Sequence, residues 1–387
     1  MVTCASLNLS ERVLKRKITK SFVNIGKKLY FYIQIMNYIM KIVTLLLAIL
    51  FPVALCAQEV QVLKQHNMKK WGIPAGNYSG ITPIGGNGYA FISDKQETDG
   101  WTETTVSFEL SGDINQMQFI AHHYNVNSQK RARDSEGIVY VHGQGFFVSA
   151  EDDQQIIEIS LDGLPTRRSL SVPTCYNSSN IFSNYGFESL AYNKEKGIFW
   201  TTTEQGLRSD VSAPSSPENP QPTLLRIQSF GSDMQPLHQY AYKTDAPITR
   251  RAPRHYAFGV SEMLVLNDTT LLVMERELNI PEHYNRAKCN IRIYSVNPEQ
   301  HKPITDTSKP LSEMDSSAFL TKKLVCTFST EFRIFGRKNL ANYEGMCLGP
   351  KLPDGRQTIL LVSDSQNRAG NVFFHLKDYI RVIVINN

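Results

Sequence analysis

The chain has 387 residues, of which 41% are hydrophobic, 10% aromatic and 20% charged. This composition is typical of a globular protein and excludes disordered, collagenous and coiled-coil chains. The formal charge of +5 comes from residues 1–57, which carry eight Lys or Arg and one Glu, while the rest of the chain is close to neutral. The basic balance is therefore no argument for a nucleic-acid partner, and we expect none.

Residues 1–57 are interpreted as a segment that the mature protein lacks. Lys41 precedes an apolar run over 42–51, which is too short to cross a bilayer comfortably. We expect cleavage after Ala57 in the sequence Leu55-Cys56-Ala57, so that the mature domain spans 58–387. The predicted location is then periplasmic or extracellular, with no stable membrane span after cleavage. A lipid on Cys56 is the alternative, and the bulky Leu55 disfavours it.

Residues 1–35 fit no signal peptide, and Met36 or Met40 makes a better start. We interpret 1–35 as an upstream extension; an uncleaved cytoplasmic anchor is the alternative. Four cysteines follow residue 57, and none of them forms a CxxC motif: Cys175, Cys289, Cys326 and Cys347. Disulfides in an exported protein and free buried thiols both remain open.

The region from 58 onward contains short β-branched and aromatic runs separated by Gly, Asn, Asp and Pro, which predicts an all-β fold. One unit recurs five times: a short segment that usually contains Glu, an apolar strand, a turn, and a second apolar strand that ends in an acid. The five copies begin at Tyr78, Ser135, Phe187, Ser261 and Tyr343.

A recurring strand–turn–strand unit favours a β-propeller over a pair of β-sandwiches. Counted from positions 80, 136, 188, 262 and 344, the copies are spaced unevenly, and the two longest gaps leave room for a degenerate copy. Blades of four strands take roughly 40–55 residues. We therefore predict a six-bladed β-propeller. The strand-like segments 59–63 and 380–385 are expected to close the ring within one blade.

Equivalent positions of propeller blades converge on the central channel, so the repeated acids should be neighbours in space. The repeat predicts one set of Glu136, Glu188, Glu262 and Glu344, and a second set of Asp94, Glu151, Glu204, Glu275 and Asp364. Clustered carboxylates must protonate, pair with cations or bind a metal, and an all-oxygen cluster suits Ca²⁺. We therefore predict a Ca²⁺ site with the metal ligands Glu136, Glu188, Glu262, Glu344 and Asp364.

Basic residues beside these acids are candidates for binding an anionic substrate such as a phosphate ester: Lys95, Arg133 and Arg276. Purely structural acids, which cap strands between blades, are the alternative interpretation. Asp134 and Asn184 are interpreted as turn formers. The sequence contains no HExxH, GxxxxGK[ST] or GxGxxG motif, and no nucleophile elbow surrounds Ser261.

Several segments together resemble the phytase-like family described as esterase-like activity of phytase. They are Asn77–Thr82, Asn184–Ala191, Val260–Met263, Met274–Arg276, Asn342–Gly345 and Val362–Asp364. The resemblance covers roughly 75–385 and implies a six-bladed propeller, export from a bacterium and a Ca²⁺-dependent ester or phosphoester hydrolase. It implies catalytic roles for Glu188, Glu204, Glu262, Glu275, Arg276 and Glu344. Ser79 departs from the acidic pattern in the first copy.

Two functions follow as hypotheses. The first is an exported hydrolase of phosphate esters or other esters, with Ca²⁺ and a small anionic substrate at the acidic channel. The second is a non-catalytic propeller that binds a glycan, peptide or protein, since no nucleophile or proton relay is recognisable. The loops 209–221 and 244–256 would then make the binding surface.

Overall fold

The computed structural model describes residues 32–43, 60–94, 99–124, 133–250, 253–371 and 374–386. The chain divides into two compact units, Met1–Gln58 and Glu59–Asn387. The described part of the first unit is an exposed α-helix over 32–43. The expected cleavage site at 55–58 lies outside the described residues. None of the helices in the described segments is both long and apolar enough to cross a membrane.

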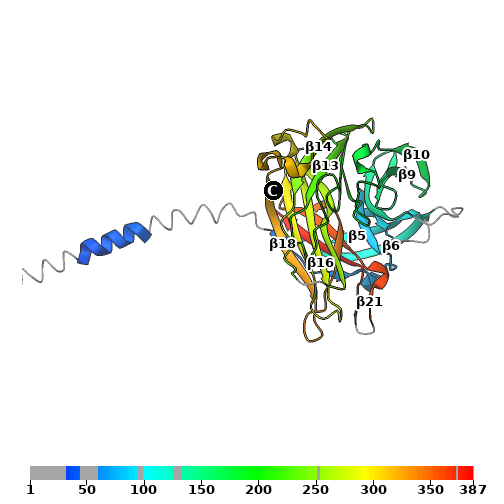
Figure 1. Cartoon of the computed structure of the whole chain (residues 1–387). Helices are drawn as coiled ribbons and strands as arrows, with labels where there is room; N and C mark the ends of the chain where they lie inside the picture. Colours follow the sequence, from blue (N-terminus) through cyan, green and yellow to red (C-terminus); the bar gives the residue numbers. More distant parts are fainter. Residues whose placement is uncertain are drawn as a thin grey trace, which may run out of the picture. The chain divides into compact units, whose positions relative to one another are not determined.

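The second unit, drawn in Figure 1, is a β-propeller built from five antiparallel sheets, four with four strands and one with five. We call these sheets the first to fifth blades. The first blade contains β3 (Tyr78–Gly85), β4 (Gly88–Ser93), β5 (Gly100–Phe108) and β6 (Ile114–Tyr124), and the second contains β7 (Ser135–Val141), β8 (Gly145–Ala150), β9 (Ile156–Ile159) and β10 (Pro165–Ser169). The third contains β11 (Phe187–Asn193), β12 (Ile198–Thr203), β13 (Leu224–Phe230) and β14 (Pro236–Lys243).

The fourth blade contains β15 (His255–Asn267), β16 (Thr270–Ile280), β17 (Ala287–Val296) and β18 (Lys322–Phe332). The fifth contains β19 (Asn342–Lys351), β20 (Gln357–Asp364), β23 (Tyr379–Ile385) and β1 (Val60–Val62), and β2 (His66–Asn67) also pairs with β23. A separate small hairpin joins β21 (Gly370–Asn371) to β22 (Phe374–His375). The 3-10 helices are η1 (Met68–Trp71), η2 (Thr174–Tyr176), η3 (Pro298–Gln300), η4 (Leu311–Glu313), η5 (Ser316–Ala318) and η6 (Gln366–Arg368).

The predicted propeller is confirmed, but the predicted number of six blades is wrong, since the described residues form five. The two long gaps between repeats hold insertions rather than another blade. In the third blade, residues 204–223 connect β12 to β13. In the fourth, residues 297–321 connect β17 to β18, and the hairpin strands β15 and β16 are 13 and 11 residues long. Repeat spacing alone cannot distinguish such insertions from a degenerate blade.

The two ends of the propeller close the ring in the fifth blade, as predicted. β1 pairs antiparallel with β23, which brings Val60 opposite Ile385 and Val62 opposite Ile383. β23 in turn pairs with β20. Because strands from both ends of the propeller share the fifth blade, neither end can separate without breaking that sheet. The pairing also covers a sheet edge that would otherwise be open to another chain.

The innermost strands β3, β7, β11, β15 and β19 contact one another in sequence around the channel, and β19 returns to β3. They approach closely enough to require glycine. A Cβ at Gly80 would lie 2.5 Å from the carbonyl oxygen of Glu136, and one at Gly345 would lie 2.7 Å from that of Ser79. The channel is therefore narrow at these positions.

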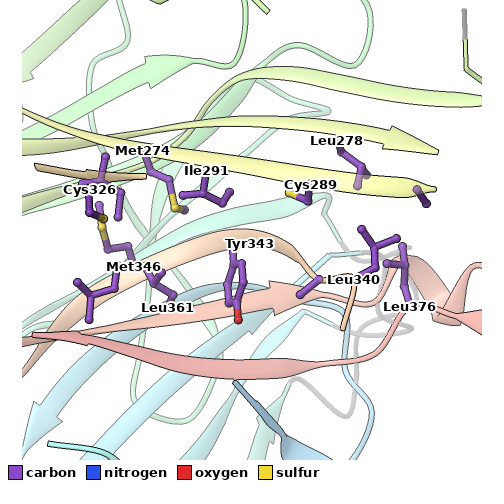
Figure 2. Packing of buried hydrophobic residues seen from close by; sticks show 14 of the residues in the cluster. Met274, Leu278, Cys289, Ile291, Cys326, Leu340, Tyr343, Met346, Leu361 and Leu376 are labelled. Carbon is purple, nitrogen blue, oxygen red and sulfur yellow. The ribbon is translucent and has the colours of Figure 1, made fainter. Parts of the chain in front are cut away.

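Apolar side chains fill the spaces between neighbouring blades. Figure 2 shows one such layer, in which Met274 and Ile291 of the fourth blade face Met346 and Leu361 of the fifth. Cys289 and Cys326 lie in the same layer. All four cysteines of the propeller are free thiols in the described structure, and three of them are buried. These thiols behave as small core residues.

The insertion 297–321 covers the outer edge of the third blade. Its backbone donates to β14 from Ile304 N to Gln239 O and from Leu320 N to Ala241 O, both at 2.8 Å. A buried ion pair holds it there: both oxygens of the Asp210 carboxylate accept from Arg226 at 2.7 Å, and Arg226 also donates to the carbonyl oxygens of residues 307 and 309. Two insertions are thus joined through one buried guanidinium.

Candidate functional site

Each innermost hairpin contains a β-bulge at the end away from its turn, and the bulges define equivalent positions in the five blades. In the third blade, Phe187 pairs with Thr203 and Ser189 with Thr202, so Glu188 is the bulged residue. The bulged residues of the five blades are Ser79, Glu136, Glu188, Ser261 and Glu344. In each hairpin, the residue before the bulge pairs with a residue near the end of the second strand, as Phe187 does with Thr203. The residues that come directly after this partner are Asp94, Glu151, Glu204, Arg276 and Asp364. A bulge re-aims a side chain, which directs these residues to one end of the channel.

Carboxylates gather at this end of the channel. Oxygen atoms of Asp94, Asp134 and Glu136 lie within 4.8 Å of one another, and so do those of Glu136, Glu151 and Glu188. Glu136 belongs to both groups. Glu204 and Glu344 interact electrostatically with Glu188. We call these seven residues, Asp94, Asp134, Glu136, Glu151, Glu188, Glu204 and Glu344, the acidic cluster.

Burial dominates the protonation of the cluster. Glu136 and Glu188 are only 6% and 7% exposed, and burial raises the pKa of both well above the ordinary value. Repulsion from neighbouring carboxylates raises these pKa values further. Burial also raises the pKa of Glu204, while Arg276 opposes this shift, and the result is about 7. Burial and mutual repulsion thus both favour the protonated forms of Glu136 and Glu188.

Arg276 brings a positive charge into the cluster from the position at which the other blades carry an acid. Its guanidinium donates to Glu344 Oε1 at 2.8 Å, to Glu204 Oε1 at 2.5 Å and to Asn342 Oδ1 at 3.0 Å. Asn342 donates in turn to Glu344 Oε1 at 2.6 Å. Arg276 Nε has no hydrogen-bond partner among the described residues. One side of the acidic cluster is therefore neutralised internally.

The register of the fourth blade differs by one residue from the predicted repeat. Val260 pairs with Glu275 and Glu262 with Met274, so the bulged residue is Ser261, and Glu262 and Glu275 each lie one position away from the expected place. In a strand, a shift of one residue turns a side chain to the opposite face. The structure therefore places Glu262 and Glu275 outside the acidic cluster.

Glu262 lies in the channel among backbone amides instead. Its Oε1 accepts from Leu190 N at 3.1 Å and Met263 N at 2.9 Å, and the carboxyl also accepts a backbone hydrogen bond from Met346. These three amides belong to three neighbouring innermost strands. Burial raises the pKa of Glu262 well above its ordinary value, although the three hydrogen bonds oppose the shift. Glu262 thus joins three blades.

Glu275 lies between the third and fourth blades. It accepts from Tyr242 Oη at 2.7 Å, from Lys322 Nζ at 2.7 Å and from Asp245 N at 3.0 Å. Burial raises the pKa of Glu275, and Lys322 opposes the shift. This carboxylate is fully engaged in holding the blades together.

The other predicted residues are distributed as follows. Asp364 is fully buried at the ring position of the fifth blade and accepts from Gln366 N at 2.8 Å. Arg133 forms a bidentate pair with Asp153, with N–O distances of 2.7 and 2.8 Å, and also donates to the carbonyl oxygen of residue 155. Lys95 lies outside the described residues. Asn184 has a positive φ of 58°, as expected of a turn former.

Sequence reasoning missed Asp134 and Asn342 as members of the site. Both stand two positions before a bulged acid, Glu136 or Glu344, and Asn77 has the same relation to Ser79. This recurring polar residue was a signal in the repeat. The interpretation of Asp134 as a turn former overlooked it, since aspartate before a strand is common for local reasons.

The donor set fits a hard cation. The two three-carboxylate groups provide oxygen ligands alone, and their spacing allows one ion to contact several of them. A cation bound there would offset the mutual repulsion of these buried carboxylates. The described residues can therefore hold a metal such as Ca²⁺.

Comparison with solved structures gives distant likenesses. The endo-arabinase from Bacteroides thetaiotaomicron is 10% identical, with 82% of this chain and 95% of that chain covered and a TM-score of 0.43. The virginiamycin B lyase from Staphylococcus aureus is 10% identical, with coverages of 85% and 100% and a TM-score of 0.33. For a luciferin-regenerating enzyme the identity is 11%, the coverages are 83% and 95%, and the TM-score is 0.38. Likenesses this distant carry no argument about activity.

No protein of curated function matches the chain. A family model does match most of the propeller. It is the phytase-like family, described as esterase-like activity of phytase, and it covers residues 73–366. The matched segment contains the acidic cluster, Arg276 and all five innermost hairpins. The chain therefore belongs to the phytase-like family.

Proposed function

We propose that the protein hydrolyses phosphate esters or other esters at the acidic cluster, with a bound divalent cation, Ca²⁺ first among them. The observation that carries the proposal is the position of Glu136, which is shared by two groups of three carboxylates within 4.8 Å. Membership of the phytase-like family supports a hydrolytic role.

The charge of the site supports the need for a cation. Seven carboxyl groups converge, and Arg276 is already engaged with Glu204 and Glu344. An anionic ester approaching such a cluster would be repelled. The carboxylates of the acidic cluster would hold such a cation, which would offset this repulsion and supply Lewis-acid polarisation of the ester and a lowered pKa for a bound water.

The residues of the chain then have separate roles. Asp94, Asp134, Glu136, Glu151 and Glu188 are the candidate ligands of the cation. We assign Glu204, with a pKa of about 7, as the group that accepts a proton from the attacking water. Arg276 orients Glu204 and Glu344 through its two terminal nitrogens. Half-buried Tyr185 interacts electrostatically with Glu204 and Glu151, at the edge of the cluster.

Calcium-dependent unfolding tests the cation site. The protein is stripped with chelator, and thermal unfolding is followed as Ca²⁺ is returned. A ligand that binds only the folded state stabilises it by about 2.7 kcal/mol at a hundred times its dissociation constant. We expect a saturable rise in the midpoint that Glu136→Gln removes. Glu262→Gln is the matched control, because it neutralises another buried channel carboxyl outside the acidic cluster, and it should retain the response.

Hydrolysis of p-nitrophenyl phosphate and p-nitrophenyl acetate tests the activity. We expect Ca²⁺-dependent turnover of at least one ester that falls in Glu136→Gln and Glu204→Gln and persists in Glu262→Gln. A calcium response without turnover of either ester would favour the non-catalytic binding propeller. Absence of any response up to millimolar Ca²⁺ would contradict the metal site, leaving the carboxyls as protonated or charge-paired structural groups.

We also propose that the protein acts outside the cytoplasm, in the periplasm or the exterior. The basic residue Lys41, the apolar run 42–51 and the small residue Ala57 support this location. Sequencing of the mature N-terminus tests it: a start at Gln58 is expected, and a start at Met1 or Met36 would contradict cleavage.

A further inference from the structure

The opposite end of the channel holds a cavity of about 420 Å³. All five innermost strands contribute to its lining. Its floor consists of five aliphatic or thioether side chains at equivalent positions, each two residues beyond the bulged residue: Ile81, Ile138, Leu190, Met263 and Met346. We call this cavity the aliphatic chamber.

The chamber is separated from the acidic cluster by one ring of residues. In that ring Gly80, Gly137 and Gly345 let the strands approach closely, and added Cβ atoms would lie 2.5–2.7 Å from backbone atoms of the next blade. Glu262 stands at the same position in the fourth blade, and its buried carboxyl accepts hydrogen bonds there from Leu190 N and Met263 N. The propeller axis is thus divided into a charged compartment and an apolar one.

The wall of the chamber is apolar, and its mouth is polar. Leu264, Val265, Leu266 and Leu348 are partly exposed and line the wall. Charged and amide side chains lie in the hairpin turns around the mouth, among them Lys194, Glu195 and Asp268. Lys194 and Glu195 are 3.6 Å apart and highly exposed, so charges of both signs are available there.

We propose that the aliphatic chamber binds the hydrocarbon chain of a small amphiphile, with the polar head of that molecule at the mouth. A volume of about 420 Å³ is within the range of small-molecule sites, roughly 300–1,000 Å³. Residues at the turn ends of four innermost hairpins line the mouth, which suits a small molecule that enters along the channel axis. The aliphatic floor favours a flexible alkyl or acyl chain that enters end-on.

Chain length is the property that tests this assignment. Each buried methylene contributes about 0.8 kcal/mol, which corresponds to a roughly fourfold gain in affinity. Calorimetric titration of the full chain with octanoate, decanoate and dodecanoate should therefore show one site per chain, and affinity should rise roughly fourfold per methylene until the chamber is full. Decyl glucoside is uncharged and carries a ten-carbon alkyl chain. It should bind within a few-fold of decanoate, because the mouth carries both signs of charge and does not require an anionic head.

Filling the chamber provides the structural control. Leu264→Trp and Leu348→Trp place a larger side chain in the wall from two different blades, and each should weaken decanoate binding at least tenfold. Leu161→Trp makes the same change at an exposed position, 52% accessible, outside the chamber, and it should bind as the parent does. Thermal unfolding of each variant shows whether the propeller is intact, and two separate wall variants guard against the failure of one to fold.

Three results would overturn the proposal. The first is no binding of any chain up to millimolar concentration. The second is unchanged binding in both folded wall variants. The third is a stoichiometry well above one that increases with chain length, which would indicate adsorption to the surface. None of these depends on the acidic cluster, so the outcome is independent of the proposed hydrolase.

Discussion

Replacing Arg276 with methionine should destabilise the propeller in a pH-dependent manner. Arg276 is 3% exposed and pairs with Glu204 and Glu344, which are 3% and 5% exposed. Removing one partner from a buried ion pair costs about 3–5 kcal/mol, because the remaining charge is left uncompensated. For a domain of this size each kcal/mol lowers the unfolding midpoint by about 2 °C, so a fall of roughly 6–10 °C is expected.

The pH dependence follows from Glu204. Its pKa is raised from the usual value of 4.5 to about 7, mainly by burial, so between these pH values the folded state holds a proton that the unfolded state has lost. The free energy of unfolding therefore decreases as pH rises through this window. Arg276 lowers the pKa of Glu204, and its removal extends the window above pH 7. The deficit of Arg276→Met should grow with pH by about 1.4 kcal/mol for each unit of further pKa rise.

Urea unfolding at about pH 5.5 and about pH 8.5, without metal, measures this effect. Arg381→Met is the matched control: Arg381 is a buried arginine that stacks on Phe328 and Tyr343, at 4.9 and 5.7 Å from the ring centres. Its loss should cost similar free energy at both pH values. A deficit of Arg276→Met that is equal at both pH values, or larger at the lower one, would refute the coupling of Arg276 to Glu204.

Three further predictions concern the frame around the site. Glu262→Leu should destabilise the protein by about 1–3 kcal/mol for each backbone amide that it leaves unpaired. Glu262→Gln keeps an acceptor and removes the cost of ionisation, so its free energy of urea unfolding should be close to that of the parent. Arg226→Met should lower the free energy of unfolding by about 3–5 kcal/mol and expose the 297–321 insertion to limited proteolysis. Adding Asp210→Leu should recover part of this free energy, and additive losses in the double variant would contradict a coupled pair. Gly345→Ala should cost at least about 1–3 kcal/mol because its Cβ would lie 2.7 Å from Ser79 O, and an unchanged unfolding midpoint would mean that the strands can separate.

Much of the architecture could be predicted from the repeat. The recurring hairpin indicates a propeller, and the strand-like ends indicate closure, since β1 and β23 have the alternating and β-branched residues of paired strands. The number of blades could not be obtained in this way. The connection 297–321 adds length without adding a sheet, and it is stabilised by contacts with β14 and Arg226 that have no signature in the spacing of the repeats.

The acidic cluster could be predicted in part. Glu136, Glu151, Glu188, Glu204 and Glu344 follow from the repeat, since their blades keep one register. The fourth blade could not be aligned from its residue types alone. The true equivalents of the acids in the other blades are Ser261 and Arg276, and each has a glutamate next to it, Glu262 or Glu275, that the sequence repeat selects instead. In a bulged hairpin the hydrogen-bond register decides which residue faces the channel, and composition does not reveal it.

The fourth blade carries Ser261 and Arg276 at the positions where most other blades carry acids, and this makes the charge at the end of the channel asymmetric. If every blade carried an acid at both ring positions, the carboxyls would repel one another on all sides, and most would be protonated. Ser79 and Ser261 remove two of these acids, and Arg276 replaces a third with a cation that pairs with Glu204 and Glu344. The carboxylates that are close enough to share a cation come from the first, second and third blades. A repeat that is nearly symmetric in sequence thus produces a one-sided site: clustered carboxylates, where we propose that the cation binds, lie on one side, and Arg276 pairs on the other with Glu204, the proposed proton acceptor.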